Sequence, residues 1–140
     1  MIDFNKLTTQ AQNTILAAND VMQRYQNSQL DPIHLLLASV EDNTTVVHDI
    51  LQELKINSDN FKEDVEKAVN SLPKITYSQT GGQLYLSNDF HSMYEKASEI
   101  ASTMKDSFIS LEHFLLAMSE MSNNLVSEVL KKNNIQKIVY

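Results

Sequence analysis

The sequence predicts an all-α fold made of two similar halves. An internal repeat is the first observation: the segment Ile33–Ala38 reappears as Glu112–Ala117, with an offset of 79 residues. The second is that apolar residues recur at helical rather than alternating intervals in both copies. The third is that the chain has only two glycines and two prolines, too few for the many tight turns of a barrel or sandwich. We therefore expect two pseudo-symmetric repeats of about four helices each, packed as one bundle.

The repeat also sets the domain organisation. A chain of 140 residues makes one domain, 1–140, with repeat one at about 4–72, a linker at 73–85 and repeat two at about 86–140. The linker holds both glycines, Gly81 and Gly82, and we interpret it as a plain connection, with a binding loop as the minority interpretation. The last helix of repeat two would begin near position 137, so it is either missing or cut by a domain boundary, which we favour.

One apolar stripe predicts the first helix of each repeat. In repeat one the stripe consists of Ala11, Ile15, Ala18, Met22 and Tyr25. In repeat two the offset turns these into Phe90, Tyr94, Ala97, Ala101 and Met104. Thr8 and Ser87, which also correspond, are predicted to cap the two helices at their N-termini.

Shorter helices follow in both copies. Asp31 before Pro32 has the pattern of an N-cap and first helical residue, and Ser110 is the equivalent cap in repeat two. Third helices are expected at about 45–54 and 124–132. A fourth is expected to begin near Ser58, with a buried face made of Phe61, Val65, Ala68, Val69 and Leu72.

Composition excludes several classes of function. The absence of cysteine excludes disulfides and thiol catalysis and favours a cytoplasmic location. A net charge of −7 disfavours nucleic acid as a partner, because phosphate binding needs clustered Lys and Arg. No apolar run reaches the roughly 20 residues of a membrane span, and the N-terminus lacks the pattern of a signal peptide, so we expect no membrane partner.

No motif for catalysis or for cofactor binding is present. Two adjacent glycines cannot form a phosphate-binding loop, so we expect no catalytic residue and no cofactor in this chain. No two of the four histidines have the i, i+3 or i+4 spacing of a metal site on one helix face, so we expect no metal either. His34 and His113 correspond by the repeat, and we interpret both as half-buried residues that bond helix-end backbone.

Two segments, Leu30–Ala38 (LDPIHLLLA) and Phe108–Met118 (FISLEHFLLAM), resemble the Clp N-terminal domain of AAA+ unfoldases. The resemblance covers about Phe4 to Asn134. The segments FNKLTTQAQ, LPK, TGGQLYLS and KDSFISLEHFLLA make it most similar to the ClpB disaggregase branch. It implies an all-helical accessory domain in front of ATPase rings that this sequence does not contain. ATP, magnesium, a hexameric parent and cooperation with the DnaK system would belong to those missing parts, while the isolated domain would be a monomer.

The resemblance also implies site residues. ClpB-type domains depend on a threonine at the start of the first helix, an acidic residue before the F-I-S segment and a glutamate after it. Here these residues are Thr8, Asp106 and Glu112. The ClpC branch, associated with phosphoarginine recognition, carries a glutamate before the histidine in both copies, whereas this chain has Ile33 in the first.

We therefore expect a substrate-capture module for exposed apolar segments of misfolded or aggregated proteins. The alternative is an adaptor-docking or phosphoarginine-binding domain of a ClpC/ClpA-type protease subunit, and a third is a scaffold element that stabilises the ring. The seam between two helical repeats is a natural peptide groove, and we expect Met93 and Tyr94 at its margin. Met104 would add adaptable surface, and Asp106 and Glu112 a negative rim for basic client residues.

Overall fold

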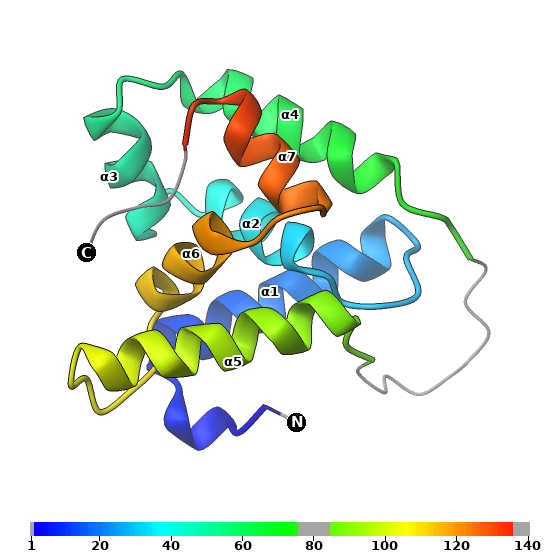
Figure 1. The fold of residues 1–140 in the computed structure, drawn as a ribbon. Coiled ribbons are helices and arrows are strands. Elements are labelled where there is room, and N and C mark those ends of the chain that lie inside the picture. The colour runs from blue at the N-terminus through cyan, green and yellow to red at the C-terminus, as the bar shows by residue number, and fades with distance from the viewer. Residues whose placement is uncertain (1, 76–84, 136–140) are drawn as a thin grey trace.

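The computed structural model describes residues 2–75 and 85–135. Within these ranges the chain is helical, as expected (Figure 1). A 3-10 turn, η1 (Phe4–Lys6), is followed by α1 (Thr9–Arg24), α2 (Pro32–Glu41), α3 (Val46–Glu53), α4 (Ser58–Asn70), α5 (Asn88–Thr103), α6 (Leu111–Glu120) and α7 (Leu125–Lys132). The predicted Gly81–Gly82 linker and the start of a last helix near 137 lie outside the described residues.

The helices begin at the same places in both repeats. Thr8 Oγ1 accepts the Ala11 N–H at 3.1 Å, and Ser87 Oγ accepts the Phe90 N–H at 3.1 Å, so both predicted caps are confirmed. Asp31 caps α2, with Pro32 as its first residue, and Ser110 is the N-cap residue of α6. Each cap satisfies backbone N–H groups that the first turn leaves without a helical partner.

The helices also end in the same way. Gln26 and Lys105 occupy equivalent positions after α1 and α5 and have φ values of 58° and 62°. The residues that follow them, Asn27 and Asp106, donate their N–H groups to Met22 and Ala101 at 3.0 and 2.9 Å. This is the Schellman arrangement, which usually has glycine at the left-handed position.

Two short backbone bridges lock the repeats together. Leu7 pairs with Ile109, and Leu30 pairs with Leu86. The offset of 79 carries Leu7 onto Leu86 and Leu30 onto Ile109, so each bridge is the image of the other. The start of each repeat is therefore held by the other repeat, and α1 and α5 run in opposite directions (Figure 1).

The core surrounds the pseudo-twofold axis. A small apolar cavity of about 30 Å³ lies between α2, α3, α4, α6 and α7. Its lining includes two pairs of equivalent residues, Leu36 with Leu115 and Leu51 with Leu130, together with Val47, Ile50, Phe61 and Ile135. Phe61, Val65 and Val69 form the buried face of α4, as the spacing predicted, while Ala68 and Leu72 are partly buried.

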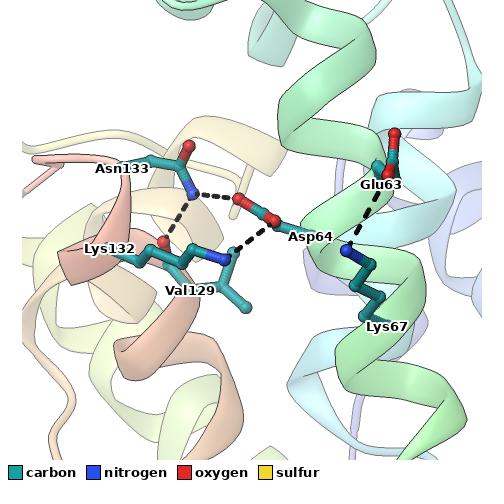
Figure 2. Close-up of polar contacts among 6 residues, drawn as sticks. All are labelled: Glu63, Asp64, Lys67, Val129, Lys132 and Asn133. Atoms are coloured by element: carbon teal, nitrogen blue, oxygen red, sulfur yellow. Dashed lines mark hydrogen bonds and ion pairs between the residues drawn. The ribbon is translucent and has the colours of Figure 1, made fainter.

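A polar contact joins the repeats on the outside of α4 and α7 (Figure 2). Asp64 accepts hydrogen bonds from Lys132 Nζ at 3.1 Å and Asn133 Nδ2 at 3.2 Å, and the bond from Lys132 is the main cause of the lowered pKa of Asp64. Glu63 and Lys67 pair at 3.8 Å along α4. None of the helices in the described ranges is long and apolar enough to cross a membrane.

Candidate functional site

Thr8 lies on one of the two segments that meet at the Leu7–Ile109 bridge, and Asp106 and Glu112 flank the other. The Thr8 N–H donates to the Ile109 carbonyl at 3.0 Å, and the Ile109 N–H donates to the Lys6 carbonyl at 2.8 Å. Ile109 lies three residues from Asp106 and three from Glu112. The start of α1 thus sits against the segment that carries both acidic residues.

His113 holds the Asp106 side chain. The Ser110 N–H donates to His113 Nδ1 at 2.8 Å, so Nδ1 is an acceptor and the ring proton belongs on Nε2. Nε2 lies 2.8 Å from Asp106 Oδ2, and the Nε2–H group donates to this carboxylate oxygen. The His113 side chain is 4% exposed and that of Asp106 is 46% exposed, so a buried histidine orients a carboxylate that faces outward.

The equivalent pair in repeat one, His34 and Asn27, is buried and uncharged. His34 Nδ1 accepts the Asp31 N–H at 2.9 Å, and Nε2 lies 2.8 Å from Asn27 Oδ1. Asn27 is 2% exposed, and burial lowers the pKa of His34 to about 4. The predicted bonds from both histidines to helix-end backbone are confirmed, but His34 and His113 are buried rather than half-buried.

Glu112 is exposed in the first turn of α6, where the helix dipole favours an anion. Its counterpart Ile33 is fully buried. The two repeats therefore differ at this position in both charge and exposure.

The expectation for Met93 is wrong, because Met93 lies in the core with 0% of its surface exposed. Its equivalent in repeat one, Thr14, is also buried, so the inner face of these helices includes this position in both copies. Tyr94 is partly buried: its ring lies 6.4 Å from that of Phe114, and its hydroxyl oxygen accepts the Asp3 N–H at 3.4 Å. Tyr94 therefore packs between α5, α6 and the start of the chain.

Two exposed apolar side chains flank Asp106 instead. Met104 is 43% exposed, as its predicted role as adaptable surface requires, and Phe108 is 53% exposed. In the sequence, Phe108 stands out only as part of the KDSFISLEHFLLA motif. Its position two residues after Asp106, outside any helical stripe, was the signal that could have identified it. The end of the bundle thus combines two apolar contacts with carboxylate acceptors.

This arrangement can bind a polypeptide. Apolar side chains of a partner can contact Met104 and Phe108, while N–H groups or cations can bond the Asp106 carboxylate. Among the residues that the structure describes, no group of three or more His, Asp or Glu side chains is placed to hold a metal ion.

Comparison with known proteins agrees with this fold. The chain matches the Clp repeat (R) N-terminal domain family over residues 6–133. It is 33% identical over 136 residues to the chaperone protein ClpB of Clostridium perfringens, an alignment that covers 95% of this chain and 16% of that protein. Its identity to the chaperone protein ClpB 1 of Nostoc sp. is 35% over 133 residues, or 95% of this chain and 15% of that protein. The chain thus spans about one sixth of these relatives.

Solved structures show the same architecture. The Hsp104 N-terminal domain from Candida albicans matches with a TM-score of 0.80 and 21% identity, over 94% of this chain and 83% of that one. A ClpV N-domain in complex with a VipB peptide matches with a TM-score of 0.70 and 17% identity, over 94% of this chain and 81% of that one. From the family match, we conclude that this chain belongs to the Clp repeat N-terminal domain family, and its sequence is similar to part of the ClpB chaperones.

Proposed function

We propose that this chain is the substrate-capture domain of a ClpB-like protein disaggregase. It binds exposed apolar segments of misfolded or aggregated proteins at the end of the bundle that carries Thr8, Asp106 and Glu112. The observation that carries the proposal is the exposure of Met104 and Phe108 on either side of the oriented Asp106 carboxylate. Exposed apolar side chains beside polar acceptors suit segments that are apolar with flanking basic residues.

The remaining activities belong to a longer protein. ATP hydrolysis with magnesium, hexamer formation and cooperation with the DnaK system are assigned to parts of the parent that this chain does not contain. The domain itself would act as a monomer in the cytoplasm. We expect weak and rapidly reversible binding, micromolar or weaker, which is roughly −8 kcal/mol at most, because a capture domain must release its clients.

An NMR titration with an unfolded, aggregation-prone polypeptide tests the proposal. Amide shifts that cluster around Thr8, Asp106 and Glu112 would support it. Shifts confined to α3, α4 and α7 would overturn the site, and no shifts at millimolar client would overturn the capture role.

Phosphoarginine recognition is tested in the same samples. A symmetric two-site reader needs an acidic residue before each histidine, and the first repeat offers only the fully buried Ile33. We therefore expect no tight binding of phosphoarginine. Stoichiometric binding would instead favour the protease-subunit alternative.

A further inference from the structure

The two repeats end their first helices in equivalent turns whose surroundings differ. Residues 25–27 form one turn, which we call the covered turn, and residues 104–106 form the other, the open turn. The turns have the same backbone hydrogen bonds and lie at opposite ends of the antiparallel α1 and α5 (Figure 1). Any difference in what covers them therefore comes from the rest of the chain.

An extended segment of the chain itself lies on the covered turn. The Ile75 N–H donates to the Gln26 carbonyl at 2.8 Å, and Asn27 Nδ2 donates to the Pro73 carbonyl at 3.1 Å. Lys74 Nζ donates to the Tyr25 carbonyl at 3.0 Å and lies 5.4 Å from the centre of the Tyr25 ring. Pro73–Ile75 thus shows how three residues of extended chain fit this turn.

No described segment covers the open turn in this way. Met104, the equivalent of the partly buried Tyr25, is 43% exposed. The Asp106 side chain is 46% exposed, whereas Asn27 is 2% exposed. Phe108 adds a second exposed apolar side chain next to the turn, at 53%.

The change from Asn27 to Asp106 reverses the kind of hydrogen-bonding group that a partner must offer to the turn. The amide of Asn27 donates to a backbone carbonyl, but the carboxylate of Asp106 can only accept. A chain on the open turn must therefore offer Asp106 a donor, and a cation makes the stronger bond. His113 fixes Asp106 Oδ2, so the carboxylate meets its partner in one orientation.

Other charged groups share this end of the molecule. Glu112 is exposed on α6, and Lys6 and Lys105 are exposed on the two segments that the Leu7–Ile109 bridge joins. The selectivity of the open turn accordingly depends on the position of the Asp106 carboxylate and not on a broad negative surface.

The geometry points to the open turn as the seat for an extended client segment that carries a lysine or arginine. The client would lie as Pro73–Ile75 lies on the covered turn, with an N–H group donating to the Lys105 carbonyl and its cation on Asp106. Met104 and Phe108 contact its apolar side chains. This inference rests on the proposed capture function and names the register and the charge of the bound segment.

Two short extended peptides test it, identical except for one central residue, lysine in one and glutamine in the other. We expect the lysine peptide to bind about two- to fivefold more tightly, the range of a solvent-exposed ion pair. Amide shifts should centre on Met104–Phe108 and leave Tyr25–Asn27 unchanged. Shifts that instead grow with protein concentration in the absence of peptide would place a second copy of the chain on the open turn and overturn the inference.

Variants make the test specific. Asp106→Asn copies the amide that repeat one already accommodates beside His34, so the fold should hold while the preference for lysine disappears. Asp59→Asn is the matched control, because it removes the same charge from an exposed position on α4 and should keep the preference. His113→Asn keeps an acceptor for the Ser110 N–H but cannot reach Asp106, and it should lower the preference without abolishing apolar binding.

The possible results distinguish binding at the open turn from the proposed capture function. Binding of both peptides with no preference, or a preference that survives Asp106→Asn, would overturn the inference and leave the capture function standing. Failure of both peptides and of an unfolded client to bind would overturn the capture function, and the inference with it.

Discussion

Acidification should destabilise this domain through His34. The ring is fully buried, both nitrogens are engaged in hydrogen bonds, and burial lowers its pKa to about 4. In the unfolded chain the pKa of the same group returns to its ordinary value of 6.5. Below pH 6.5 the imidazole of His34 is protonated in the unfolded state but stays neutral in the folded state until about pH 4. The free energy of unfolding therefore decreases as the pH falls.

The magnitude follows from the two pKa values. Each unit of difference is worth about 1.4 kcal/mol, so His34 should cost about 3 kcal/mol of stability as the pH falls from 6.5 to about 4. The contribution is fully present above pH 6.5 and is lost progressively until the folded state also protonates. For a domain with a typical stability of about 5–15 kcal/mol, this is a substantial fraction.

Urea unfolding at a series of pH values measures this loss. The control is His34→Asn, whose own stability is lower but which lacks the titrating group, so the difference between the two curves isolates His34. We expect that difference to have a slope of about 1 kcal/mol per pH unit between pH 6 and 4.5, because the unfolded state then binds nearly one proton more than the folded state. Where the variant is too unstable to use, an NMR titration of the wild-type ring should show no protonation above pH 5. Stability curves of wild type and variant that run parallel with pH, or a His34 ring that protonates near pH 6.5, would show that burial of His34 does not control the acid sensitivity.

Three further predictions concern core packing, the open turn and the Asp64–Lys132 contact between the repeats. Leu36→Ala should enlarge the cavity on the pseudo-twofold axis and lower the unfolding free energy by about 2–5 kcal/mol in chemical denaturation; a smaller loss would mean that the core collapses around it. Phe108→Ser should leave stability within about 0.5 kcal/mol yet weaken client binding in a fluorescence titration, and unchanged binding would remove Phe108 from the site. Asp64→Asn should cost about 0.2–1 kcal/mol, less at high salt, and a loss that salt does not reduce would contradict an ion pair with Lys132.

The sequence predicted the helices well because their ends are encoded locally. Thr8, Ser87 and Asp31 are cap residues whose side chains bond backbone within three positions, and all three act as expected. The prediction of which residues of the first helix in each repeat are buried was less accurate. Met93 lies beside the stripe and is buried instead of lining a groove; its equivalent Thr14 is buried as well, with its hydroxyl donating to the Gln10 carbonyl at 2.8 Å.

The candidate site could not be derived from local patterns. Thr8 meets Ile109 across the Leu7–Ile109 bridge, a contact between residues far apart in the sequence, and only the resemblance to a known family named Thr8, Asp106 and Glu112. The correspondence of Asn27 with Asp106, and of His34 with His113, was visible in the sequence. The pairing of these residues was not, because it depends on the turn geometry that follows each first helix.

A crystal structure of the domain with the lysine-bearing peptide would show directly where a client segment lies. We expect an extended peptide on residues 104–106, with a backbone N–H donating to the Lys105 carbonyl, as Ile75 donates to Gln26, and with its lysine on Asp106. A peptide seated on another face of the bundle, or on these residues with its cation away from Asp106, would contradict it.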